Sequence, residues 1–198
     1  MRKLAILIFQ TLDGVMQAPS VPEEDSSGDF TQGGWAKEYW EDVMEQVSRE
    51  AMAEPYDLLL GRRTYDIFAS SFANAEVGNP IAQKLNLAKK YVVTSRSDAL
   101  HWHNSERITR DIVAKVLLLK QQDGPLLQVH GSWQLVQTLL KNRLIDELRL
   151  WTFPVVVGSG KRLFSDGAVP ATYRLTKFEP CASGAFMHFY QPIGQGSV

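Results

Sequence analysis

Three short segments, each directly after an apolar run, combine small residues with a basic side chain or a helix start. They are Gly61-Arg62-Arg63-Thr64, Ser95-Arg96 and Gly131-Ser132-Trp133. A glycine lets backbone approach a ligand closely, and the free N–H groups at a helix start favour an anion. An arginine can place two N–H groups on phosphate oxygens. These residue types therefore predict a phosphate-binding site.

A turn with solvated arginines is the alternative for any one of these segments alone. Their shared place after strands favours the phosphate site, because ligands of open α/β sheets bind beyond the carboxyl ends of the strands. An arginine suits the 2′-phosphate of NADP(H), whereas NAD usually requires an acidic residue. The chain has no G-x-G-x-x-G after its first apolar run and no G-x-x-x-x-G-K-[ST], which argues against an ordinary dinucleotide fold and a P-loop.

The elements that position these segments alternate between strands and helices. Strands are expected at 3–9, 57–60, 89–94, 125–130 and 146–157, and helices at 36–53, 62–71, 81–87, 109–121 and 131–141. Two later β-rich runs, 172–180 and 185–191, are separated by Ser183-Gly184, which is typical of a hairpin. This order predicts an α/β fold with a mostly parallel central sheet and an antiparallel C-terminal hairpin.

Residues 10–36 are rich in glycine and proline, lack periodicity and contain an acidic patch at 23–25. A connection this long is usually functional or disordered. Its aromatic residues argue against disorder, so we interpret it as an active-site loop over a pocket. Trp35 and Tyr39 could stack on a flat heterocycle there, and packing in the core is an equal alternative.

The composition limits the class of protein. The 198 residues suit a single domain, residues 1–198, and a net charge of −1 argues against nucleic acid or an anionic membrane as partner. The single Cys181 excludes an internal disulfide and suits the cytoplasm. No run approaches the roughly 18–20 apolar residues of a membrane span. His101 and His103 lack acidic or cysteine partners in a recognisable pattern, so no metal site is expected.

Several longer motifs occur in a familiar order. They are Thr-Leu-Asp-Gly (11–14), Gly-Gly-Trp (33–35), Leu-Leu-Gly-Arg-Arg-Thr-Tyr (59–65), Thr-Ser-Arg (94–96) and the run from Val-His-Gly-Ser-Trp to Gly-Ser-Gly-Lys-Arg-Leu-Phe (129–164). Over about residues 3–191 the chain resembles the dihydrofolate-reductase-like family that includes the reductase (RibD C-terminal) domain of riboflavin-biosynthesis deaminase-reductases. It lacks the deaminase zinc signature and so resembles the reductase half alone.

The resemblance implies a three-layer α/β/α fold that binds NADPH. The turn with Gly61, Arg62, Arg63 and Thr64 would lie against the cofactor phosphates, Ser95 and Arg96 near the adenosine 2′-phosphate, and Gly131, Ser132 and Trp133 at the pyrophosphate. The loop 10–36 would cover the nicotinamide. Many relatives have Gly-Gly where this chain has His130-Gly131, and His130 could titrate there or be packed and hydrogen-bonded.

The residues that serve the substrate are less well specified. Dihydrofolate reductases hold the pterin with a carboxylate at the start of the helix after the covering loop, a position shared here by Glu38, Glu41 and Asp42. Asp13 is the other candidate, and a solvated role is the alternative for each acid. Gly158 and Lys161 could bind a substrate phosphate at the pocket mouth, with an exposed basic turn as the alternative.

The resemblance implies an NADPH-dependent reductase of a pterin- or pyrimidine-like heterocycle. Candidate substrates are the riboflavin precursor 5-amino-6-(5-phosphoribosylamino)uracil, dihydrofolate and another pterin. The alternatives are a non-catalytic module that binds a dinucleotide or pterin, and a scaffold without cofactor. Pairing through sheet edges is common among relatives of this kind. The aromatic-rich stretch 148–157 supports it, so we expect a homodimer, although a covered strand would explain that stretch equally well.

Overall fold

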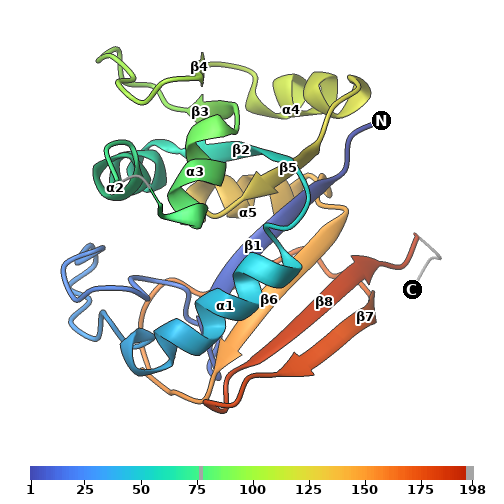
Figure 1. The fold of residues 1–198 in the computed structure, drawn as a ribbon. Coiled ribbons are helices and arrows are strands. Elements are labelled where there is room, and N and C mark those ends of the chain that lie inside the picture. Colours follow the sequence, from blue (N-terminus) through green and yellow to red (C-terminus); the bar gives the residue numbers. More distant parts are fainter. Residues whose placement is uncertain (76–77, 195–198) are drawn as a thin grey trace.

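The computed structural model describes residues 1–75 and 78–194. Its centre is an eight-stranded sheet in the order β4-β3-β2-β5-β1-β6-β8-β7 (Figure 1). The strands are β1 (Leu4–Thr11), β2 (Tyr56–Gly61), β3 (Lys90–Val93), β4 (Ser105–Ile108), β5 (Leu126–Val129), β6 (Glu147–Phe153), β7 (Tyr173–Pro180) and β8 (Phe186–Pro192). The helices are the 3-10 helix η1 (Lys37–Tyr39), α1 (Trp40–Glu50), α2 (Arg62–Phe72), α3 (Pro80–Leu87), α4 (Ile112–Gln121) and α5 (Trp133–Lys141).

Strands β1 to β6 pair in parallel, whereas β8 runs antiparallel to both β6 and β7. The expected parallel sheet with an antiparallel C-terminal hairpin is therefore confirmed. Gly61 at the end of β2 pairs with Val93 at the end of β3, and β2 also pairs with β5. The three segments singled out in the sequence thus follow neighbouring strands.

Two cores cover the two faces of the sheet, which gives the three expected layers. The first core includes Val43 and Val47 of α1, Tyr65 of α2 and Leu85 of α3. The second includes residues of α4 and α5. Strand β1 is buried on both sides because Leu7 faces the first core while its neighbours Ile6 and Ile8 face the second.

The sequence prediction missed one strand and misplaced some boundaries. Strand β4 was not predicted, because its four residues at the sheet edge, Ser105–Ile108, are mostly polar and form no apolar run. Strand β6 ends at Phe153 rather than at 157, since Pro154 has no N–H to donate to a neighbouring strand. Helix α4 begins at Ile112, after Asp111 in a left-handed conformation.

The apolar stretch 148–157, one reason to expect a homodimer, is largely covered by the chain itself. Strand β6 lies between β1 and β8, and the side chains of Trp151 and Phe153 are fully buried. This stretch therefore no longer argues for a partner. Among residues 1–75 and 78–194, no helix is long and apolar enough to cross a membrane.

Candidate functional site

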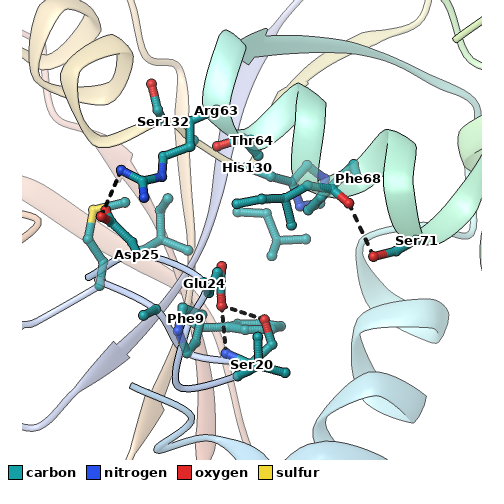
Figure 2. A pocket seen from close by; sticks show the side chains of 18 of the residues that line it. Phe9, Ser20, Glu24, Asp25, Arg63, Thr64, Phe68, Ser71, His130 and Ser132 are labelled. Carbon is teal, nitrogen blue, oxygen red and sulfur yellow. Dashed lines mark hydrogen bonds and ion pairs between the residues drawn. The ribbon is translucent and has the colours of Figure 1, made fainter. Parts of the chain in front are cut away.

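A cavity of about 530 Å³ opens beyond the carboxyl ends of β1, β2 and β5 (Figure 2). Its walls come from β1, the loop that follows β1, helices α1 to α3 and the start of α5. Arg63 and Thr64 line it after β2, and Gly131, Ser132 and Trp133 line it after β5. The structure thus brings together two of the three segments singled out in the sequence.

The starts of α2 and α5 pack closely because two glycines leave room. The N–H of Gly61 donates to the carbonyl of Gly131 at 3.0 Å. A Cβ atom on Gly61 would lie 2.1 Å from Oγ of Ser132, and one on Gly131 would lie 2.7 Å from Oγ1 of Thr64. Neither helix start has a side-chain cap. The two helix starts therefore lie close together without side-chain caps, which suits an anion.

The side chains of Arg62 and Arg96 lie close together near the start of α2, and neither lines the cavity. Nε of Arg62 donates to Asp66 at 2.8 Å, and Nη2 of Arg96 donates to Asp98 at 2.9 Å. Arg62 also pairs with Asp98. The side chain of Arg96 is 59% exposed and that of Arg62 only 13%. Ser95 is exposed next to Arg96. The structure therefore joins the first and second segments through shared carboxylates.

The two basic side chains that line the cavity, Arg63 and Lys161, pair with the same carboxylate. Asp25 contacts Nη1 of Arg63 at 2.9 Å and Nζ of Lys161 at 2.5 Å. Burial alone would raise the pKa of Asp25, but hydrogen bonds from Lys161 and Ser27 hold that pKa below its usual range. Asp25 is therefore ionised and forms an ion pair with each of the two cations.

The candidate acids Asp13, Glu41 and Asp42 do not line the cavity. Asp13 accepts hydrogen bonds from Thr11 at 2.6 Å and from the N–H of Gly158 at 2.9 Å. Burial would raise the pKa of Asp13, but these bonds hold it below its usual value. Asp42 accepts from the N–H of Ser183 at 2.7 Å, and Glu41 is exposed.

The aromatic candidates Trp35 and Tyr39 also lie outside the cavity lining. Their rings pack edge-on against Phe153, with centroids at 5.2 and 5.6 Å. Nε1 of Trp35 donates to the carbonyl of Gln17 at 2.9 Å, which fastens the covering loop. Gly158 is exposed and is tied to Asp13. Of the proposed substrate residues, only Lys161 lines the cavity.

An apolar wall forms much of the remaining lining, where α1 presents Trp40, Met44 and Val47 at helical spacing. Trp40 packs edge-on against Phe9 of β1, with ring centroids at 5.7 Å. This apolar wall consists of the apolar cavity residues of β1 and of α1 to α3, together with Met52 after α1. Its members are Leu7, Ile8, Phe9, Trp40, Met44, Val47, Met52, Ile67, Phe68, Phe72, Ile81 and Leu85.

His130 adjoins this wall. Its ring centroid lies 5.3 Å from that of Phe68, and its Nε2 is 3.0 Å from the amide nitrogen of Gln128. Burial lowers the pKa of His130 to about 4, so the imidazole is neutral at neutral pH. Of the two sequence interpretations, the structure shows the packed, hydrogen-bonded histidine.

The sequence prediction did not assign Ser20 and Glu24 of the covering loop, both of which line the cavity. The acidic patch 23–25 was the signal that could have found Glu24. Among residues 1–75 and 78–194, no group of three His, Cys, Asp or Glu side chains could hold a metal ion.

The family model of the RibD C-terminal domain matches residues 2–187. The chain belongs to this family. YyaP of Bacillus subtilis (strain 168), described as uncharacterized, is 28% identical over 135 residues, which are 67% of this chain and 72% of YyaP. YwjB of the same organism, also described as uncharacterized, is 26% identical over 192 residues, which are 95% of this chain and 97% of YwjB.

Two solved structures share the fold of this RibD C-terminal family member. One is a protein of Shewanella sp. PV-4 named for riboflavin biosynthesis, with a TM-score of 0.64 and 17% identity over 97% of this chain and 99% of that chain. The other is dihydrofolate reductase from Enterococcus faecalis complexed with NADP(H) and RAB-propyl, with a TM-score of 0.60 and 14% identity over 96% of each chain. The family is thus that of the RibD C-terminal domain, and the fold is shared with a dihydrofolate reductase.

Proposed function

We propose that this protein is an NADPH-dependent reductase of a small, flat heterocycle of the pterin or pyrimidine type. The observation that carries this proposal is one cavity that joins two uncapped helix starts to an apolar wall. The helix starts suit the phosphates of a dinucleotide, and the wall suits aromatic rings. The dihydrofolate reductase of the same fold, which is complexed with NADP(H), supports this assignment.

The residues at the helix starts fit a dinucleotide. Thr64, Gly131 and Ser132 would hold the pyrophosphate, because a side chain at Gly131 would fill the space beside Thr64. Arg63 and Trp133 would flank it. When bound, NADPH supplies a hydride, and the protein's own contribution is to orient the rings and exclude water.

The cluster beside the cavity would hold the 2′-phosphate. Arg96 is exposed and Arg62 lies next to it, so both could exchange part of their contact with Asp98 for a phosphate. Ser95 would add a hydroxyl. This arrangement favours NADPH over NADH.

The acceptor would be reduced on the apolar side of the cavity. A 5-amino-6-(5-phosphoribosylamino)uracil reductase-like activity and a dihydrofolate reductase-like activity are the two leading forms of the proposal. Lys161 is the cation available for a substrate phosphate, and such a phosphate would have to compete with Asp25 for it. Asp13 and Gly158 would act indirectly, by shaping the turn that carries Lys161.

The proposal is tested with the purified protein, NADPH and NADH. A thermal shift much larger with NADPH than with NADH, followed by loss of absorbance at the reduced-nicotinamide band with dihydrofolate, a pterin or the riboflavin precursor, is the expected result. The absence of any shift with NADPH would contradict the proposal. NADPH binding without turnover across the panel would favour the alternative of a non-catalytic dinucleotide- or pterin-binding module.

We also propose a homodimer, which would cover the face of the hairpin at the sheet edge. Leu175 and Phe178 of the edge strand β7 are 49% and 57% exposed. Exposed apolar side chains on an edge strand favour association. Sedimentation of the wild type and of Phe178→Glu tests this: a dimer that the variant turns into a monomer is expected, and a monomeric wild type would contradict it.

A further inference from the structure

Three carboxylates line the cavity, and all three belong to the covering loop. They are Glu23, Glu24 and Asp25. Asp25 is held by Arg63 and Lys161, and Glu23 is exposed. Glu24 is half-buried and forms no ion pair with residues 1–75 or 78–194. The charge of Glu24 therefore has no cationic partner in the described part of the chain.

One oxygen of Glu24 is anchored and the other is available. Oε2 accepts a hydrogen bond from the N–H of Ser20 at 2.8 Å and from its hydroxyl at 2.5 Å. Within the described residues, no donor is bonded to Oε1. Figure 2 shows both bonds between Glu24 and Ser20, and shows the other oxygen directed away from Ser20 toward the middle of the cavity, across from Phe68 and His130. The anchor fixes the carboxylate so that Oε1 faces the space where a ligand would bind.

The apolar wall opposite this oxygen carries no charge. Helix α1 turns Trp40, Met44 and Val47 to the cavity, while Asp42 bonds to Ser183 and Glu41 lies exposed. His130 at the edge of the wall is packed on Phe68. A ring that lies on this wall would meet Oε1 of the half-buried Glu24, to which no donor is bonded among residues 1–75 and 78–194.

The other charges of the cavity disfavour an anionic group on the ring that packs on the apolar wall, whereas a phosphate on a flexible tail could still reach Lys161. Arg63 and Lys161 already share Asp25, and two more carboxylates stand beside them. An ionised carboxylate accepts hydrogen bonds and donates none. Its natural ligand on an uncharged ring is therefore an N–H group.

We infer that Oε1 of Glu24 binds the ring N–H groups of a neutral, planar heterocycle that packs on the apolar wall. This inference rests on the proposed function, because it names the class of acceptor that the reductase would take. A donor-bearing ring forms a charge-assisted hydrogen bond with Glu24. A ring without donors leaves the desolvated carboxylate unpaired, which opposes binding more strongly than the loss of an ordinary contact.

Lumazine and 1,3-dimethyllumazine form a matched pair of probes, because they share one ring system and the methyl groups remove the ring N–H donors. Calorimetric titrations at pH 6.5, with and without NADP⁺, measure both affinities for the wild type, Glu24→Gln and Glu23→Gln. Both substitutions keep the length of the side chain. Glu23 lines the cavity and is exposed, so Glu23→Gln is the matched control. Lumazine-6-carboxylate provides the anionic ring.

The wild type is expected to bind lumazine roughly 10- to 100-fold more tightly than the dimethyl compound, the range for a hydrogen bond to a charged group. Glu24→Gln should lose most of this ratio and Glu23→Gln should keep it, while lumazine-6-carboxylate binds less tightly than lumazine. Equal affinities of the wild type for the two matched compounds would overturn the inference. So would an unchanged ratio in Glu24→Gln, a preference for the carboxylate, or no lumazine binding.

The failure of the proposed function has a different signature. A thermal shift with NADPH is measured on the same samples and does not depend on lumazine. If NADPH fails to bind while the lumazine ratio depends on Glu24, the reductase proposal is contradicted and the assignment of Glu24 stands. If NADPH binds while the ratio is absent, the assignment of Glu24 is contradicted.

Discussion

Arg62 and Arg96 follow two different strands and meet at one carboxylate, that of Asp98. They come together because Gly61, the last residue of β2, pairs with Val93 of β3. The two strands therefore end at the same edge of the sheet. Arg62 is largely buried and Arg96 is exposed. The guanidinium of Arg62 is therefore held in place by carboxylates, and that of Arg96 is accessible to solvent beside the cavity.

Replacement of Arg96 by glutamine should lower the affinity for NADPH and leave that for NADH nearly unchanged. A lost hydrogen bond between charged groups predicts roughly a 10- to 100-fold loss. Titration of both nucleotides by fluorescence measures it. Arg110→Gln, at another exposed arginine, is the control. An equal loss for both nucleotides would show that Arg96 does not contact the 2′-phosphate.

Asp25→Asn should bind NADPH about two- to fivefold more tightly at low salt. The substitution removes the carboxylate that occupies Arg63 and Lys161, so both become available to the cofactor phosphates. The gain should shrink as salt screens the charges. Calorimetry at two ionic strengths measures this effect, with Glu23→Gln as control. Weaker binding by Asp25→Asn would instead mean that Asp25 is needed to hold the loop.

Gly61→Ala should destabilise the protein by about 1–3 kcal/mol and abolish NADPH binding. The added Cβ would lie 2.1 Å from Oγ and 2.8 Å from the backbone nitrogen of Ser132, so one helix start must move. Urea unfolding and the NADPH thermal shift measure the two effects. Gly194→Ala, where a Cβ would meet nothing within 4 Å, should change neither. Unchanged unfolding free energy and NADPH thermal shift in Gly61→Ala would contradict the close packing of the two turns.

Asp13→Asn should cost about 1–2 kcal/mol of unfolding free energy with little change in NADPH affinity. Its carboxylate holds the N–H of Gly158 and pairs with Arg162, so its charge stabilises the turn after β6. Urea unfolding measures the loss, and Glu41→Gln on the exposed side of α1 is the control. Unchanged stability with lost turnover would point instead to a catalytic role for Asp13.

Stability should fall as the pH drops from 6.5 toward 4, and His188 should cause part of the fall. His188 is 8% exposed, contacts Oγ1 of Thr152 at 2.7 Å, and burial lowers its pKa to about 4. In the unfolded chain His188 is protonated below about pH 6.5, whereas in the folded protein it stays neutral until the pH nears 4. Protonation therefore favours the unfolded chain as the pH falls. His188 alone should thus lower the free energy of unfolding by roughly 1–2 kcal/mol at pH 5 relative to pH 7.5.

Urea unfolding at both pH values tests this dependence. His188→Gln should flatten it in part, and His130 should supply a further contribution of the same sign. The exposed His101→Gln is the control and should leave the dependence unchanged. An equally steep pH dependence in His188→Gln would contradict the assignment.

Much of the fold follows from local patterns in the sequence. Apolar runs and helical periodicity predicted β1, α1, β2 and α2 within a few residues, because these elements bury their own apolar side chains. Strand β4 escaped prediction because Ser105–Ile108 are held mainly by pairing with β3, which leaves no apolar pattern. The glycines Gly61 and Gly131 were likewise visible, since the close approach of the two helix starts leaves no room for a side chain at either position.

The sequence by itself determined the alternation of strands and helices, the family, and the residue types at the turns with Gly61 and Gly131. The tertiary structure decided which side of α1 faces the cavity, the shared pairing of Arg63 and Lys161 with Asp25, and the free oxygen of Glu24. Local patterns depend on neighbours in the chain. The direction of a side chain and the partner of a charge depend instead on contacts between segments far apart in sequence, which form only when the sheet assembles.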